Sequence, residues 1–194
     1  MWTRAGWTAI LIALVACGGE RAGEGETAPQ PGPDDPVEVG DASDAPESWN
    51  RGGATAASTV TSEVTVLSSL RTGRHDEFER IVLELGDRGG GFPGHTVEYV
   101  DRPLHDCGSG EETFPVGDAW LEIRLYPIDA HTQEGQPTVD HRPRDLPGLE
   151  NILRVYTTCD FEAVVTLVLA MRSPKEFRVF RLDAPRRIVV DVRK

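Results

Sequence analysis

The clearest regularity in the chain is an alternation of apolar and polar positions with a period of two. Leu121, Ile123 and Leu125 alternate with charged residues, and residues 177–180 and 188–192 repeat the alternation. A period of two sends neighbouring side chains to opposite faces of a β-strand. We therefore predict three strands here, each with one face in a core and the other face in solvent.

Other segments carry enough branched apolar residues to form strands. Residues 161–170, FEAVVTLVLA, are apolar on both faces, which is typical of a central strand covered on both sides. Residues 78–85 fit the spacing of a helix as well as that of a strand, and we favour a strand because the neighbouring segments need pairing partners. Strands are also predicted at residues 60–70, 96–100 and 152–159.

Clusters of turn-forming residues separate these segments. Glycine, proline and acidic residues gather at residues 86–94, 107–112 and 183–187, as expected of loops and tight turns. About eight strands that do not alternate with helices favour an all-β fold. Residues 58–194 are enough for one domain with its own core, so we predict a single sandwich-like or barrel-like domain.

The composition changes upstream of residue 58. Residues 18–57 are rich in Gly, Pro, Ala, Asp and Glu and nearly lack branched apolar residues, so we predict that they stay disordered. They hold nine acidic residues against Arg21 and Arg51, a net charge of −7 out of the −12 of the whole chain. The acidic excess thus belongs to a tether rather than to a binding face, and the acidity disfavours nucleic acid as a partner. Trp49, the one large apolar residue of the tether, is expected to be incidental.

The start of the chain has the layout of an export signal. Arg4 precedes an apolar run at residues 5–16, and a helix of that run spans about 18 Å, short of the roughly 30 Å of a bilayer core. A basic start, a short apolar run and a small residue are typical of a secretory signal peptide. Residues 14–17, Leu-Val-Ala-Cys, resemble the lipobox of bacterial lipoproteins. That resemblance implies cleavage after residue 16 and a lipid on Cys17, and secretion with a free Cys17 is the alternative.

Several blocks of the predicted domain resemble the AMIN-like domain of bacterial exported proteins and lipoproteins. The blocks are GRHDEFERIVLEL (73–85), YVDRPL (99–104), AWLEIRLYPIDAHT (119–132), TCDFEAVVTLVLAM (158–171) and FRVFRLDAPRRIVVDV (177–192). The resemblance covers nearly all of residues 60–194. It implies a non-catalytic β-domain that localises proteins in the cell envelope, with peptidoglycan as the ligand. The predicted organisation is a signal peptide at 1–16, a lipid-anchored tether at 17–57 and an AMIN-like domain at 58–194.

The cysteine count agrees with export. If Cys17 carries the lipid, Cys107 and Cys159 remain as an even pair, and two thiols in one small domain outside the cytoplasm are usually joined. We therefore predict a disulfide between them. The alternative is a reactive Cys107 beside His105 and Asp106, but neighbouring residues on one loop rarely have the geometry of a nucleophile and its base.

No pattern for catalysis, metals or cofactors stands out. The histidines are scattered and have polar neighbours: His75, His95, His105, His131 and His141. The sequence has no H-E-x-x-H and no C-x-x-C motif, and the glycine-rich run at 86–94 lacks the G-K-[ST] ending of a phosphate-binding loop. We therefore expect no enzymatic activity, no bound metal and no cofactor.

The last predicted hairpin carries the candidate ligand-binding residues. Arginine pairs well with carboxylates, which peptidoglycan stem peptides carry. The candidates are the four arginines of this hairpin: Arg178, Arg181, Arg186 and Arg187. Alternatively, these arginines form the solvated face of an edge strand, where charges also prevent pairing between sheets. Trp120 and Tyr126 are expected to pack in the core or at its rim.

The sequence thus predicts a lipid-anchored, extracytoplasmic protein of the cell envelope. We expect it to bind or localise to peptidoglycan or other cell-wall material without catalysing a reaction. One alternative is an accessory module that binds another envelope protein through a sheet edge. A weaker alternative is a hydrolase that uses His105 or Cys107. The expected partners are a membrane, through the lipid, and either cell-wall material or an envelope protein.

Overall fold

The structure, a computed structural model, describes residues 48–194, and every element in that range is a β-strand. The predicted signal peptide, the predicted lipidation site at Cys17 and most of the predicted tether lie outside the described residues. Between residues 48 and 194, no helix is long and apolar enough to cross a membrane.

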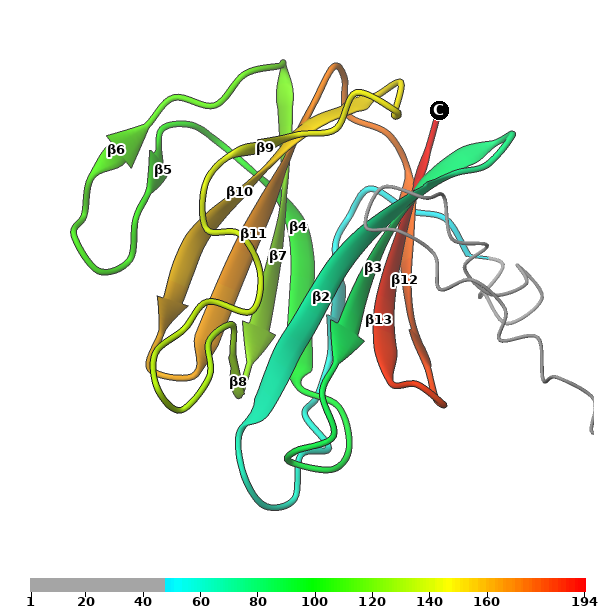
Figure 1. The fold of residues 1–194 in the computed structure, drawn as a ribbon. Helices are drawn as coiled ribbons and strands as arrows, with labels where there is room; N and C mark the ends of the chain where they lie inside the picture. The colour runs from blue at the N-terminus through cyan, green and yellow to red at the C-terminus, as the bar shows by residue number, and fades with distance from the viewer. Residues whose placement is uncertain (1–47) are drawn as a thin grey trace, which may run out of the picture. The chain divides into compact units, whose positions relative to one another are not determined.

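Two large sheets and one small strand pair make up the described part (Figure 1). The six-stranded sheet contains, in spatial order, β1 (Ala54–Ala56), β4 (Gly94–Val100), β7 (Ala119–Tyr126), β11 (Val164–Met171), β10 (Ile152–Phe161) and β9 (Arg144–Asp145). The five-stranded sheet contains, in the same manner, β12 (Phe177–Leu182), β13 (Arg187–Arg193), β3 (Phe78–Leu85), β2 (Thr65–Arg74) and β8 (Ile128–Asp129). The small pair is β5 (Leu104–His105) with β6 (Glu112–Thr113).

The all-β prediction is confirmed, and the two large sheets form an open sandwich rather than a closed barrel. Each of the eight predicted strands corresponds to a strand of six residues or more: β2, β3, β4, β7, β10, β11, β12 and β13. Residues 78–85 form a strand, which resolves their ambiguous spacing. The strands that the sequence did not predict are two or three residues long. β1 and β8 pair with strands that are distant in sequence, and β5, β6 and β9 lie within long connections.

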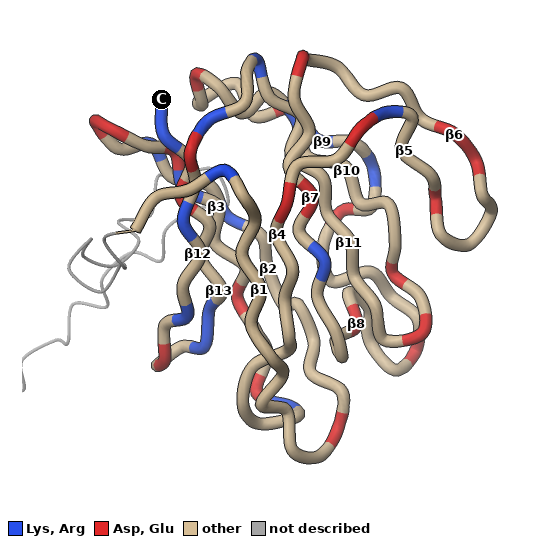
Figure 2. The backbone as a smooth tube through the Cα atoms, turned by 180° about the vertical axis from the view of Figure 1, so that it is seen from behind, with Lys and Arg blue, Asp and Glu red and all other residues tan. Residues whose placement is uncertain are grey.

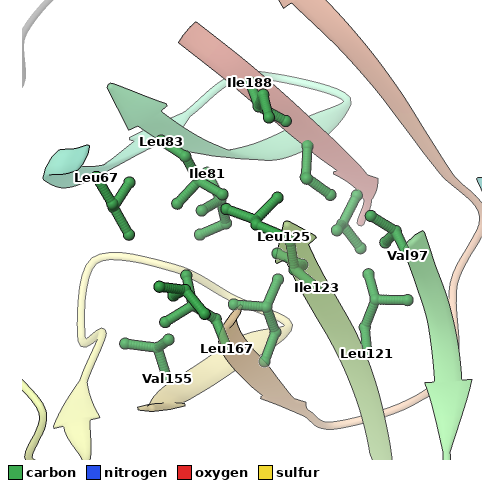
Figure 3. Close-up of a cluster of buried hydrophobic side chains, with 14 of the residues drawn as sticks. Leu67, Ile81, Leu83, Val97, Leu121, Ile123, Leu125, Val155, Leu167 and Ile188 are labelled. Carbon is green, nitrogen blue, oxygen red and sulfur yellow. The ribbon is translucent and has the colours of Figure 1, made fainter. Parts of the chain in front are cut away.

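The core lies between the two large sheets and is built from the alternating apolar residues. Figure 3 shows side chains of the two sheets directed toward one another. The five-stranded sheet contributes Leu67, Ile81, Leu83, Leu85, Ile188, Val190 and Val192, and the six-stranded sheet contributes Val97, Leu121, Ile123, Leu125, Val155, Val165, Leu167 and Leu169. Each fully buried side chain of this size contributes about 1.5–3 kcal/mol, so the period-two pattern is what joins the two sheets.

The predicted strand at residues 161–170 begins too early. Phe161 is the last residue of β10, and the chain turns at Glu162 and Ala163, whose φ angles are +50° and +59°. A two-residue hairpin turn with positive φ normally uses Asn or Gly, so the Glu-Ala pair gave no turn signal within an apolar run. Phe161 therefore belongs to the end of β10 and not to β11.

The ordered domain begins earlier than the predicted boundary at residue 58. β1 pairs with β4, as Figure 2 also shows, and Asn50 exchanges backbone hydrogen bonds with Phe177. The ring of Trp49 contacts two guanidinium groups, those of Arg178 and Arg193, each 4.5 Å from the ring centroid. Trp49 is therefore an anchor of the domain rather than an incidental residue of the tether.

The segment 101–118, which we call the arm, contains β5 and β6 and packs on the outer face of the six-stranded sheet (Figure 1). A disulfide joins Cys107 of the arm to Cys159 of β10, with 5.2 Å between the Cα atoms. Leu104 buries itself against outward-facing residues of β10 and β11. The predicted pair of cysteines is thus present, and it holds the arm against the sheet. Because the sulfur of Cys107 is bonded, the alternative of a reactive thiol does not hold.

We expect replacement of both Cys107 and Cys159 by serine to lower the free energy of unfolding by about 3 kcal/mol, because the bridge closes a loop across 52 residues. Thermal unfolding of the full chain with and without the substitutions measures this effect. Substitution Cys17→Ser is the control and leaves the unfolding midpoint unchanged. Detection of two free thiols at these positions in the unreduced protein would contradict the bridge.

Candidate functional site

The predicted arginine surface on the β12–β13 hairpin does not gather in one place that faces solvent. Arg178 is only 9% exposed, and its Nε atom donates to Asp191 at 2.9 Å. Arg80 of β3 donates to the same carboxylate from the neighbouring strand. Arg178 therefore belongs to a buried ionic cluster, which we define as Arg80, Asp191 and Arg178.

The other three predicted arginines donate to backbone carbonyl groups. Arg181 donates to the carbonyl oxygen of Ala57 at 2.8 Å, and Arg186 donates to carbonyl groups of the glycine-rich loop at residues 86–91. Arg187 donates to the nearby Pro185 carbonyl at 3.1 Å. Figure 2 shows that basic positions flank the β12–β13 turn. The contacts of Arg181 and Arg186 hold the hairpin to neighbouring segments, whereas the contact of Arg187 stays within the turn.

Exposed aromatic residues point instead to the outer face of the six-stranded sheet. Tyr126 at the end of β7 is 58% exposed, and Phe161 at the end of β10 is 57% exposed. Phe161 pairs directly with Val164 of β11. Val165 pairs with Leu125, so the next residues of the two strands, Val164 and Tyr126, lie opposite each other as well. We call Tyr126, Val164 and Phe161 the aromatic row.

The aromatic row crosses three neighbouring strands on one face. Residues paired across a sheet project to the same side, and Leu125 and Val165 point into the core, so the row points to solvent. Two strand spacings separate Tyr126 from Phe161, which is about 10 Å. Gly94 of β4 lies opposite Tyr126 and ends the row on that side. The row is thus a flat apolar strip with an aromatic ring at each end.

Charged residues border the aromatic row. Arg124, which precedes Tyr126 by two positions on β7, is exposed on the same face. One row farther, Glu122 lies directly opposite Glu98 of β4. Burial is the main cause that raises the pKa of Glu122; Arg124 lowers it and Glu98 raises it further. The face therefore offers an apolar strip, one guanidinium group and a pair of carboxyl groups.

The arm covers part of this face. Trp120 lies under the arm, with its indole N–H donating to the Val116 carbonyl at 3.0 Å and the Arg102 guanidinium 5.1 Å from its ring. Trp120 is thus packed at the rim, as predicted. The arm covers the end of the sheet near Trp120 and leaves the end near Tyr126 uncovered. The disulfide to β10 keeps the arm in this position.

Tyr126 contradicts the prediction that it packs in the core or at its rim. The signal was present in the sequence, because Tyr126 shares the even positions of β7 with Glu122 and Arg124, and those positions face solvent. Phe161 had no such signal, because the turn that follows it was hidden in the apolar run.

Two of the scattered histidines meet at one carboxylate. Asp160 of β10, whose side chain is 6% exposed, lies 2.8 Å from Nδ1 of His131 and 3.2 Å from Nε2 of His141. His95 is buried, and this burial, together with nearby Arg181, lowers its pKa to about 4. Among residues 48–194, no group of three His, Cys, Asp or Glu side chains has the arrangement of a metal site.

The described part of the chain is a β-sandwich module with an open, partly aromatic sheet face. The chain belongs to the AMIN-like domain family, whose model matches residues 65–194. Neither a curated protein nor a solved structure matches the chain. AMIN-like domains occur in extracytoplasmic envelope proteins and are generally non-catalytic binding modules. Family membership therefore indicates a peptidoglycan-related module of the cell envelope.

Proposed function

We propose that this protein is a lipid-anchored module of the cell envelope that binds the glycan strands of peptidoglycan through the aromatic row. The lipid anchor rests on the sequence alone: the short apolar run at residues 5–16 and the Leu-Val-Ala-Cys box that ends at Cys17. In this proposal residues 18–47 act as an acidic spacer between the membrane and the domain.

The observation that supports glycan binding is the exposure of Tyr126 and Phe161 on one sheet face. The flat C–H faces of sugars pack against aromatic rings, whose faces are electron-rich and apolar. Two rings about 10 Å apart on a flat strip suit an extended chain of sugars better than a single small molecule.

The charges beside the row fit the same class of ligand. Arg124 is placed to pair with a carboxylate, a group that peptidoglycan carries on its lactyl-linked stem peptides. In this proposal Arg124 takes the role that the sequence analysis gave to the arginines of the last hairpin.

Sedimentation of the full chain with purified peptidoglycan sacculi, in detergent and at low and moderate salt, tests the proposal. We expect the unsubstituted protein to co-sediment, and we expect Tyr126→Ala and Phe161→Ala each to weaken binding about tenfold, which corresponds to about 1.4 kcal/mol. Both side chains are exposed, so the variants should fold normally.

Phe114→Ala is the matched control, because Phe114 is an aromatic residue with 68% exposure that lies on the arm and outside the aromatic row. We expect this variant to bind as the unsubstituted protein does. Absence of the unsubstituted protein from the sacculus pellet would overturn the proposal. Equal losses from Phe114→Ala and Phe161→Ala would overturn the assignment to the row.

A further inference from the structure

A buried carboxylate lies directly behind the aromatic row. Asp160 precedes Phe161 on β10 and points to the opposite face, where it pairs with the inward-facing Val165. Its Oδ1 atom accepts a hydrogen bond from the backbone N–H of Ala130 at 2.8 Å. Its Oδ2 atom lies 2.8 Å from His131 Nδ1. The same Oδ2 atom is also 3.2 Å from Nε2 of His141.

These contacts join the two ends of the aromatic row. Tyr126 ends β7, and the chain runs through β8 into the loop at residues 130–143, which carries both histidines. Asp160 stands next to Phe161 at the other end of the row. The backbone N–H of Ile128 also donates to the Ala163 carbonyl in the β10–β11 turn at 2.9 Å. The segment after Tyr126 and the segment around Phe161 are therefore tied at one point.

We propose that Asp160, His131 and His141 form a pH-dependent clasp that holds Tyr126 and Phe161 in place, so that glycan binding strengthens as the pH falls. This inference rests on the proposed function, because it concerns the regulation of the same aromatic row. The clasp consists of the Asp160 carboxylate and the two imidazoles of the loop at residues 130–143, of which His131 carries the pH response.

The groups around the clasp decide whether the pKa of His131 is raised or lowered. The largest influence on the pKa of His131 is the hydrogen bond to Asp160, which raises it. Partial burial lowers this pKa, and the charges of Asp160 and Asp129 raise it. Arg88 of the β3–β4 loop lowers it. Asp160 also contacts His141. The net direction for His131 is a pKa above its usual 6.5.

A raised folded-state pKa means that protonated His131 stabilises the folded state. That stabilisation is complete below pH 6.5, the ordinary histidine value, and it is lost as the pH rises through the higher pKa of the folded protein. When His131 is neutral, its Nδ1 atom donates to Asp160 in only one of the two tautomers, and the attraction between opposite charges is gone. The loop at residues 130–143 is then held less firmly.

Binding to purified sacculi at pH 5.5 and pH 8.0 tests the regulation. We expect the full chain to bind about threefold to tenfold more tightly at pH 5.5, and we expect the double variant His131→Gln with His141→Gln to bind equally at both values. Glutamine keeps a donor near Asp160 but cannot gain a charge. His105→Gln is the matched control, because His105 is an exposed histidine of the arm, and it should keep the full pH response.

Hydrogen exchange of the Ala130 amide supplies a readout that needs no ligand. We expect protection of this amide to fall between pH 5.5 and pH 8.0, after correction for the intrinsic exchange rate, in the unsubstituted protein and to stay constant in the double variant. Equal protection changes in both would overturn the clasp even if sacculi bind. A pH-dependent clasp with pH-independent binding would overturn the coupling to the row. Failure of all variants to bind sacculi would instead count against the proposed function alone.

Discussion

Replacement of Glu79 by alanine is expected to lower the free energy of unfolding by about 3–5 kcal/mol. Glu79 lies on β3, is fully buried, and points between the two sheets. One carboxylate oxygen accepts hydrogen bonds from the backbone N–H groups of Glu150 and Asn151, and the other accepts the N–H of Ile152 at 2.8 Å. Alanine would leave three N–H groups at the start of β10 without this acceptor.

Urea unfolding of the full chain measures this loss. The matched control is Glu84→Ala, a glutamate on the same strand that is partly exposed, lies on the opposite face and pairs with Arg71. A surface ion pair of this kind contributes about 0–1 kcal/mol, so the control should unfold near the unsubstituted protein. A loss below about 1 kcal/mol for Glu79→Ala would show that the backbone at the start of β10 is not stabilised by this carboxylate.

The eight longer strands could be predicted from the sequence because burial of one face imposes a period of two. Leu121, Ile123 and Leu125 of β7 show this most clearly. The disulfide could be predicted because export and an even count leave little choice for Cys107 and Cys159. These features depend on local pattern and on compartment, which a single sequence contains.

The strands β1 and β8 and the early start of the domain could not be predicted, because they depend on contacts distant in sequence. Nothing in Ala54–Ala56 marks a strand, and this segment becomes β1 only because β4 offers an edge. Trp49 is ordered by Arg178 and Arg193, which lie more than a hundred residues away. Such contacts stabilise a segment whose own composition predicts disorder.

The candidate site also depends on contacts that a single sequence does not mark. The sequence does not mark the acceptors of the hairpin arginines, since Arg186 donates to carbonyl groups of the loop at residues 86–91. The aromatic row joins Tyr126 and Phe161 through strand register, which becomes known only when β7, β11 and β10 are aligned. Asp160 likewise meets His131 only after the long loop returns to the sheet.

Asp191→Ala is the second substitution for which we expect a loss of about 3–5 kcal/mol, because it removes a buried carboxylate from two arginines. Asp191 is fully buried on β13, and its two oxygens accept hydrogen bonds from Arg80 at 2.6 and 2.9 Å. Arg178 donates to the same group from the other side at 2.9 Å. Without it, two positive charges on the strands that flank β13 repel each other in a place with little water.

Three further variants separate charge from shape in this cluster. Asp191→Asn keeps the size and one acceptor oxygen, so a loss close to that of alanine would assign the effect to charge. Asp183→Ala, in the exposed turn of the same hairpin, is the control and should change stability by less than about 0.5 kcal/mol.

Arg80→Met combined with Asp191→Leu removes opposite charges together, and a replacement by apolar residues of similar volume is often neutral or stabilising. We therefore expect the double variant to unfold at a higher urea concentration than Asp191→Ala. If it is less stable than Asp191→Ala, the cluster stabilises the fold through its hydrogen-bond geometry and not merely by avoiding an unbalanced charge.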